Sequence, residues 1–129
     1  MSSQSRYHQV YEGWQQDPEG FWAEAATALD WFSPWEKIFD PDQGIYGRWF
    51  AGATGNTCYN AIDRHVNSGR AGQAAIIFDS PVTGSKEVFT YAQLLIEVEA
   101  LAAVMQERGV AKGDRVLIYM PMIPQAIFA

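Results

Sequence analysis

The sequence predicts an α/β fold in which an N-terminal helical and aromatic arm precedes a β-hairpin, a helix and a parallel strand of an incomplete sheet. Two apolar runs of strand length, Ala74–Phe78 and Glu87–Tyr91, flank a turn-forming stretch. A capped amphipathic helix follows them, and then a nearly continuous apolar run, Arg115–Tyr119. This order of strand, helix and strand is typical of a βαβ-like unit.

Composition and charge exclude several classes of protein. Hydrophobic residues make up 48% of the 129 residues and charged residues 19%, which indicates a globular chain. A nucleic-acid backbone would repel the net charge of −6, so we expect no nucleic-acid partner. The longest apolar run, Val116–Ala129, is too short for a bilayer, and the first ten residues do not resemble a secretory signal. With its single cysteine, Cys58, the chain is expected to be cytoplasmic and not membrane-bound.

Residues 1–57 are expected to form a helical and aromatic extension. Spacings of four and three residues place Tyr7, Tyr11 and Trp14 on one face of a short helix. Asp17 and Pro18 are typical of the N-cap and first position of a second helix. The apolar stripe of that helix comprises Phe21, Trp22, Ala25, Ala26 and Leu29.

The rest of this extension contains many glycines and two prolines. These residues make regular structure unlikely from Asp40 to Gly55, although Trp49 and Phe50 need burial. We therefore expect residues 31–55 to be an arm that its aromatic side chains anchor on another surface. Without that surface, the arm is expected to be partly disordered or buried in a dimer.

A second domain is expected over residues 58–129. Tyr59, Ile62 and Val66 share the face of a helix that runs from Cys58 to about Ser68-Gly69. A turn at Thr83-Gly84 then joins the two strands into a hairpin.

The clearest element is the helix that follows the hairpin. Thr90 and Gln93 form a capping box, and Gly109 stands where a helix commonly ends. Its buried face comprises Leu94, Val98, Leu101 and Met105. After the predicted strand Arg115–Tyr119, another helix begins near residues 121–125.

Three glycine-containing strings are candidates for phosphate loops, and none has the sequence context that such a loop requires. The string GATG has no following Lys-Ser/Thr pair and no clear preceding strand. TGSK is better explained as a hairpin turn, and GVAKGD as a helix end and a turn. These strings are Gly52–Gly55, Thr83–Lys86 and Gly109–Asp114.

The residues alone indicate no catalytic, cofactor-binding or metal-binding site. In Asp63-Arg64-His65, neighbouring helix positions point in different directions. A surface or pairing role for these three residues is therefore preferred to a general-base role for His65. Only His8 joins His65 as a histidine, and a structural thiol is the default for Cys58. One aromatic group could line a pocket, but core or interdomain packing is preferred for it. It comprises Trp31, Phe32, Trp35, Trp49 and Phe50.

Four segments together resemble the N-terminal region of AMP-forming short-chain acyl-CoA synthetases, the acetyl-CoA and propionyl-CoA synthetases of the adenylate-forming superfamily. The resemblance covers Tyr7 to Ala129, and the Arg48-Trp49-Phe50 and Asn56…Asn60…Asp63-Arg64 patterns look closer to the propionyl-CoA branch. The segments are DPEGFWAEAATALDW, RWFAGATGNTCYNAIDRHV, FTYAQL and GVAKGDRVLIYMPMIPQAIFA.

The resemblance implies a parent enzyme that activates acetate or propionate with Mg-ATP and transfers the acyl group to CoA. The family residues that hold ATP, the acyl group and CoA follow the region matched here, so no residue of this chain inherits a role. We therefore expect an inactive N-terminal fragment, with the large domain cut short in a helix and no ATP, Mg or CoA bound to the fragment.

An interaction module is the alternative. The expected partner of the fragment is the remainder of the parent enzyme. However, the open strands of an incomplete sheet also favour self-association, so a stand-alone, non-catalytic binding or oligomerisation module derived from the same family is the second hypothesis.

Overall fold

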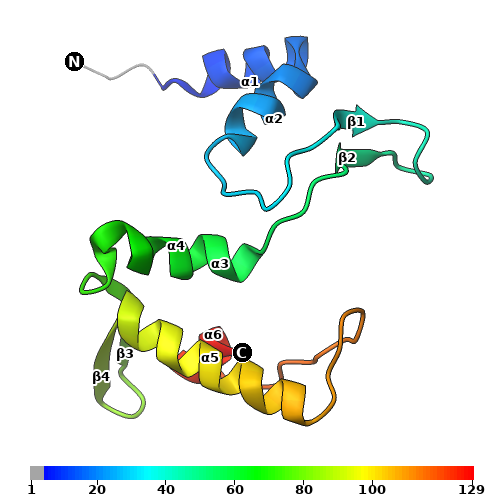
Figure 1. Ribbon diagram of the computed structural model, residues 1–129. Coiled ribbons are helices and arrows are strands. Elements are labelled where there is room, and N and C mark those ends of the chain that lie inside the picture. Colours follow the sequence, from blue (N-terminus) through cyan, green and yellow to red (C-terminus); the bar gives the residue numbers. More distant parts are fainter. Residues whose placement is uncertain (1–4) are drawn as a thin grey trace. The chain divides into compact units, whose positions relative to one another are not determined.

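The computed structural model describes residues 5–129, which belong to two compact units, Met1–Thr57 and Cys58–Ala129 (Figure 1). The first unit contains two helices and a two-stranded sheet. These elements are α1 (Tyr7–Gln16), α2 (Pro18–Ala26), β1 (Lys37–Asp40) and β2 (Arg48–Ala51).

Both predicted helices of the first unit are confirmed. Asp17 caps α2, because its Oδ1 atom accepts a hydrogen bond of 2.9 Å from the Gly20 amide and Pro18 occupies the first turn. The helix ends at Ala26, earlier than its apolar stripe indicates. Leu29 consequently lies beyond the helix and is exposed.

The prediction that residues 40–55 lack regular structure is wrong, because β1 and β2 form an antiparallel hairpin. Phe39 and Trp49 lie directly opposite each other, and their ring centroids are 4.8 Å apart. Such cross-strand aromatic pairs stabilise a hairpin. Gly47 has φ +66°, and a Cβ atom there would clash with the Phe39 ring. Glycine at this position therefore lets the ring lie against the backbone.

The expectation of a partly disordered arm over residues 31–55 is also wrong. The rings of Trp31, Trp35 and Phe50 contact one another, and each pair of ring centroids is 5.5 to 5.6 Å apart. The indole Nε1 of Trp31 donates a 2.9 Å hydrogen bond to the Ala26 carbonyl at the end of α2. The aromatic side chains therefore tie the segment to its own unit.

The second unit begins with a broken helix and continues into a hairpin and a long helix. The predicted helix over Cys58–Ser68 is interrupted at Ile62, which has φ −128° and ψ −68°, and helical backbone ends at Ser68 and Gly69, where Gly69 has φ +85°. In order, the elements are α3 (Thr57–Ala61), α4 (Asp63–His65), η1 (Val66–Arg70), β3 (Ala74–Ser80), β4 (Ser85–Thr90), α5 (Tyr91–Glu107) and α6 (Pro124–Phe128).

The predicted hairpin and capped helix of this unit are confirmed. β3 and β4 are antiparallel, and Gly84 in their turn has φ +70°. At the start of α5, Thr90 and Gln93 exchange hydrogen bonds of 2.9 and 3.3 Å between side chain and backbone. Gly109 has φ +84° just beyond the helix end, as a C′ glycine should.

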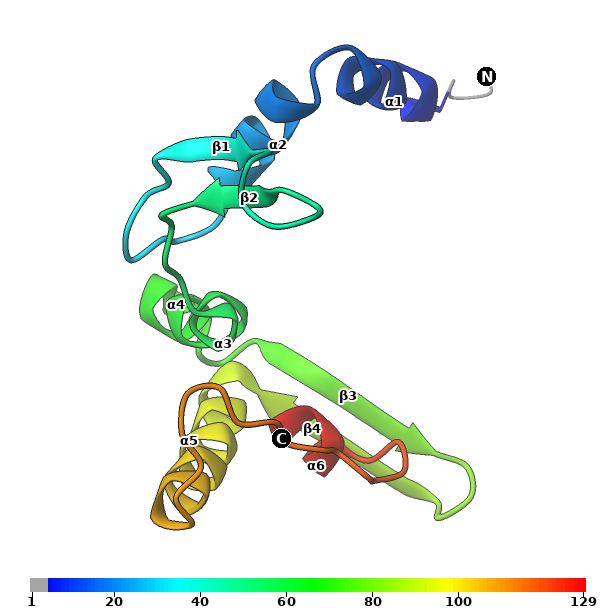
Figure 2. The same ribbon diagram turned by 90° about the vertical axis from the view of Figure 1, so that its right-hand side faces the viewer.

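The core of the second unit lies where α5 and α6 meet the hairpin (Figure 2). Ile62, Leu94 and Phe128 are its buried members, and Phe89 of β4 packs edge-on against Phe128 with centroids 5.3 Å apart. Partly buried Val98 of α5 also contacts this cluster. The aliphatic face predicted for α5 thus packs into the core, mainly through the N-terminal half of the helix.

The predicted parallel strand Arg115–Tyr119 is not formed. No helix or strand is assigned to residues 115–121, and the sheets that the described residues build are the two antiparallel hairpins. A parallel strand needs a neighbour in the same sheet, and none lies beside this segment. The α/β class with an incomplete sheet is confirmed, whereas the βαβ-like unit is not completed.

Candidate functional site

The glycine strings build turns and no phosphate cradle. Gly52, with φ +84°, bends the chain after β2, and the Thr54 amide then donates to the Ser33 carbonyl. Beside the β3–β4 turn, Lys86 of β4 lies 2.7 Å from the carboxylate of Asp79, its partner on β3, and both side chains are exposed. An exposed pair of this kind contributes little stability.

The third string, Gly109–Asp114, is a turn closed by its own aspartate. The Asp114 Oδ2 atom accepts a 2.7 Å hydrogen bond from the Ala111 amide. Gly113 has φ +101°, a conformation that side chains rarely adopt. The string therefore ends α5 and redirects the chain, as the sequence indicated.

His65 lies in a contact cluster that joins η1 to the start of α5. Its Nδ1 atom is 3.1 Å from Arg70 Nη1, and since a guanidinium can only donate, Nδ1 accepts. The His65 ring is 5.0 Å from the Tyr91 ring, and the Arg70 guanidinium lies 5.6 Å from the same ring. Arg70 Nε also donates to Gln73 Oε1 at 2.8 Å. Arg70 and Tyr91 were not singled out in the sequence, because their separation of 21 positions hides the contact.

Cys58 is not arranged as a nucleophile. Partial burial, together with the nearby negative charge of Asp63, raises the pKa of its thiol above the ordinary value. The reactive form of cysteine is the thiolate, so this environment opposes reactivity at neutral pH.

Sequence reasoning missed Asp40, the one buried charged side chain in the part of the chain that the structure describes. Its carboxylate accepts hydrogen bonds from Lys37 Nζ at 3.2 Å, Gln43 Nε2 at 3.1 Å and the Asp42 amide at 3.3 Å. The hydrogen bond from Lys37 is the main reason that the pKa of Asp40 is lowered. A carboxylate satisfied in this way holds the β1–β2 loop and is not poised for proton transfer.

Metal and membrane sites find no support in the described residues. Across positions 5–129, no three His, Cys, Asp or Glu side chains gather as a metal site would require. None of the helices described combines the length and apolarity needed to cross a bilayer.

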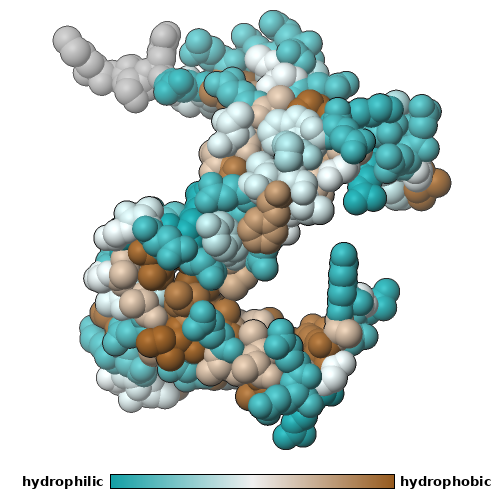
Figure 3. All heavy atoms as spheres, viewed as in Figure 1, coloured by the Kyte–Doolittle hydropathy of each residue, from teal (hydrophilic) through white to brown (hydrophobic). Residues whose placement is uncertain are grey.

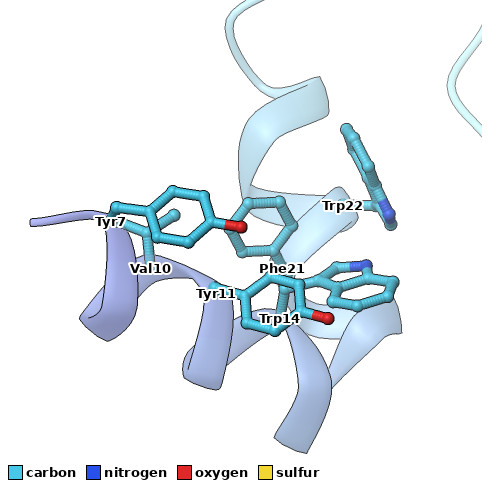
Figure 4. Close-up of a pocket in the computed structure, with 6 residues that line it drawn as sticks. All are labelled: Tyr7, Val10, Tyr11, Trp14, Phe21 and Trp22. Atoms are coloured by element: carbon cyan, nitrogen blue, oxygen red, sulfur yellow. The ribbon is translucent and has the colours of Figure 1, made fainter.

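A hollow lined by apolar and aromatic side chains lies between α1 and α2 in the first unit (Figure 4). It has a volume of about 310 Å³, and the rings from α1 and the Phe21 ring point toward one another. A ligand site normally adds a few converging polar groups to such a surface. This hollow therefore has the character of a packing surface. Its lining residues are Tyr7, Val10, Tyr11, Trp14, Phe21 and Trp22.

Comparisons with protein families divide the chain into two consecutive matches. Residues 7–61 match the family described as acetyl-coenzyme A synthetase N-terminus, and residues 62–129 match the AMP-binding enzyme family.

Individual relatives agree with these matches. The human mitochondrial acyl-CoA synthetase short-chain family member 3 is 45% identical over 98% of this chain and 18% of its own length. The acetyl-coenzyme A synthetase of Xanthobacter autotrophicus is 41% identical over 97% of this chain and 20% of its own. The structure of acetoacetyl-CoA synthetase from Streptomyces lividans superposes with a TM-score of 0.74 at 28% identity, covering 89% of this chain and 18% of that one. The chain thus spans about a fifth of the length of these relatives.

Proposed function

Because the chain belongs to the AMP-binding enzyme family, we propose that it is the N-terminal part of a short-chain acyl-CoA synthetase. In the proposed reaction, the carboxylate of acetate or propionate attacks the α-phosphorus of Mg-ATP. An acyl-adenylate forms and pyrophosphate leaves. The thiol of CoA then attacks the acyl carbon, the thioester forms, and AMP departs.

The observation that carries this proposal is the order of the two family matches. An acetyl-coenzyme A synthetase N-terminus is followed directly by an AMP-binding segment, over residues 7–61 and 62–129. The relatives are named as acyl-CoA, acetyl-coenzyme A and acetoacetyl-CoA synthetases, so short carboxylic acids joined to CoA are their common chemistry.

We assign a scaffold role to the chain itself. Phosphoryl transfer needs cations and hydrogen-bond donors converging on the phosphates. Several of the described cations instead contact neighbours in their own unit: Lys37 pairs with Asp40, Lys86 with Asp79, and Arg70 with His65 and Gln73. We therefore expect ATP, Mg²⁺ and CoA to be held by other parts of the synthetase.

A chimaera tests this function. In the Xanthobacter autotrophicus acetyl-coenzyme A synthetase, the stretch that aligns with this chain is replaced by the chain. We expect the chimaera to retain acetate-dependent exchange of pyrophosphate into ATP, whereas the 129-residue chain alone gives no exchange above buffer. Exchange by the chain alone would refute the scaffold role, and a folded but inactive chimaera would refute the proposed function.

The same chimaera examines substrate choice. The pattern Arg48-Trp49-Phe50 motivates propionate as the acid of the natural synthetase. If the scaffold role is right, the chimaera keeps the acid preference of the recipient enzyme. A shift toward propionate would show instead that the transplanted residues shape the acyl pocket.

A stand-alone interaction module is the second candidate. Two-stranded sheets with open edges and exposed apolar side chains, such as Ile77 and Leu117, favour it. Light scattering of the isolated chain distinguishes the two functions. A defined dimer at micromolar concentration supports the module, and a monomer at high concentration supports the synthetase fragment.

A further inference from the structure

The first unit contains a cleft between the start of α2 and the β1–β2 hairpin. Its volume is about 530 Å³, and its lining combines two aromatic rings with the carboxylates of Asp17 and Glu19. All of the lining residues belong to the same unit. They are Gln16, Asp17, Pro18, Glu19, Phe39 and Trp49.

The aromatic wall of this cleft is the cross-strand pair of Phe39 and Trp49. Their ring centroids are 4.8 Å apart and their planes are inclined at 42°, so the two rings form an open corner. The Phe39 ring lies against the backbone of Gly47, which limits its movement. Trp49 is 41% exposed, so a ligand can reach its ring. An accessible indole ring attracts organic cations, because the face of its π-system is negative.

The other wall of the cleft is acidic. Asp17 uses its Oδ1 atom to cap α2, and its second carboxylate oxygen is not needed for the cap. Glu19 is exposed and makes no hydrogen bond or ion pair with any residue from 5 to 129. The positive end of a helix dipole corresponds to about half an elementary charge, so two carboxylates beside it leave this wall negative.

The described part of the chain places no cationic side chain in the lining of this cleft. Lys37 is paired with Asp40, and Arg48 lies on the opposite face of the hairpin from Trp49, because successive strand residues alternate. The first unit has eight Asp and Glu residues against three Lys and Arg, so it carries −5 of the net charge of −6. On the face that Figure 3 shows, hydrophilic side chains cover much of this unit. These features favour a positively charged ligand.

We propose that the cleft binds an organic ammonium ion, which lies over the Trp49 ring and beside the Glu19 carboxylate. This site goes beyond the proposed function and does not depend on it. A divalent metal ion fits the cleft less well, since Ca²⁺ and Mg²⁺ require six or more oxygen ligands. Residues 5–129 contain no group of three His, Cys, Asp or Glu side chains that could hold one. The ammonium is that of a free quaternary amine or of a lysine side chain.

Titration of the 129-residue chain with choline tests the site, with dimethylbutanol as the uncharged analogue of the same shape. Choline should shift the indole N–H resonance of Trp49 in a nitrogen–proton NMR spectrum, with saturation and a Kd of about 1 mM. The indole of Trp22, which lines the separate hollow between α1 and α2, should not shift. Dimethylbutanol should bind at least about 10-fold more weakly, because the rings and the carboxylates attract only a cation.

Two matched variants locate the carboxylate contact. Glu19→Gln removes one charge and keeps the size of the side chain, and it should raise the Kd of choline at least about 5-fold. Glu24→Gln makes the same change in the same helix, outside the lining of the cleft, and should leave the Kd unchanged. Physiological ionic strength screens charges beyond about 8 Å, so the two positions can be distinguished. Both glutamates are exposed, so neither variant disturbs the core of the unit.

Two lysine probes identify the source of the ammonium. They are acetyl-lysine amide, which keeps the side-chain ammonium free, and the same compound trimethylated on that nitrogen. Tighter binding of choline than of both probes would assign the site to a free quaternary amine. Tighter binding of either probe would assign it to a lysine side chain of a protein, and both results retain the site.

Three results would overturn the ammonium site. They are the absence of saturation below about 10 mM choline, equal affinity for dimethylbutanol, and equal effects of Glu19→Gln and Glu24→Gln. Pyrophosphate exchange by the chimaera does not depend on any of these measurements. Failure of the ammonium site and failure of the proposed function are therefore distinguishable.

Discussion

The interiors of the two units are built from different kinds of side chain. In the first unit, the rings of Trp31, Trp35 and Phe50 pack edge-on against one another, and the buried apolar residues are the small Ala26 and Ala51. In the second, aliphatic side chains gather around Leu94 of a capped helix. The comparison teaches that rings far apart in sequence can specify a hairpin in a glycine-rich segment, whereas an aliphatic core depends on a helix that local signals already define.

Both cores are thin. None of the side chains that the structure describes is completely sealed from solvent. Each unit is therefore expected to have only a small free energy of unfolding. All five tryptophans lie in the first unit, so tryptophan fluorescence reports that unit, while hydrogen exchange at α5 reports the other.

The largest effect is expected for Leu94→Ala, which removes the centre of the aliphatic core. Leu94 is 5% exposed, and truncation of such a residue costs about 2 to 5 kcal/mol. Exchange at α5 should accelerate accordingly in urea, while the tryptophan transition stays in place. Ile96→Ala, at an exposed position of the same helix, is the control. Equal shifts in both probes would show that the units unfold together and would break the comparison.

Phe50→Ala should affect the other unit. The substitution removes the ring contacts with Trp31 and Trp35 and should lower the free energy of unfolding by about 2 kcal/mol. The urea midpoint of tryptophan fluorescence measures this change. Tyr46→Ala, which removes an exposed ring from the same hairpin, should leave the midpoint in place. A similar shift of the midpoint for both variants would show that the ring contacts of Phe50 do not stabilise the first unit.

Loss of the cap at Thr90 should have a smaller effect. Thr90→Ala removes the acceptor for the Gln93 amide and should cost about 1 kcal/mol, whereas Thr90→Ser keeps the acceptor. Exchange of amides in the first turn of α5 is the measurement. If the alanine and serine variants exchange alike, local capping does not support the aliphatic core.

The smallest expected effect is a loss of stability of the first unit at acidic pH. The pKa of Asp40 is lowered in the folded chain, so the stabilisation it provides is complete above the ordinary pKa of 3.8 and is lost as the pH falls through the folded pKa. The tryptophan midpoint of the unaltered chain should therefore fall below about pH 4, and less so in Asp40→Asn. Identical pH profiles would mean that Asp40 does not hold the hairpin.

Local signals predicted much of the fold. The cap at Asp17, the capping box at Thr90 and the hairpin turn at Thr83-Gly84 were all recognisable, because each depends on residues within a few positions. The β1–β2 hairpin escaped prediction because its stability comes from Phe39 and Trp49, ten positions apart across glycine-rich chain. The apolar pattern at Arg115–Tyr119 predicted a buried strand. A strand forms only beside a second strand, and the pattern of one segment does not show whether that second strand is present.

The candidate site was less predictable. The strings Thr83–Lys86 and Gly109–Asp114 were correctly interpreted as turns, and their glycines Gly84, Gly109 and Gly113 have positive φ values. The contact of His65 with Arg70 and Tyr91 was not foreseen, because it depends on how the chain bends at Ser68 and Gly69. Buried Asp40 also required the loop geometry that brings Lys37 and Gln43 to one carboxylate.

The exposed run at residues 116–119 has a consequence for synthesis in the cell. Val116, Leu117, Ile118 and Tyr119 lie outside both hairpins and are exposed to solvent. Apolar strand segments in that condition are bound by chaperones or aggregate, and chains that stay so exposed are degraded. The lifetime of the chain in the cell therefore depends on how soon this segment is covered.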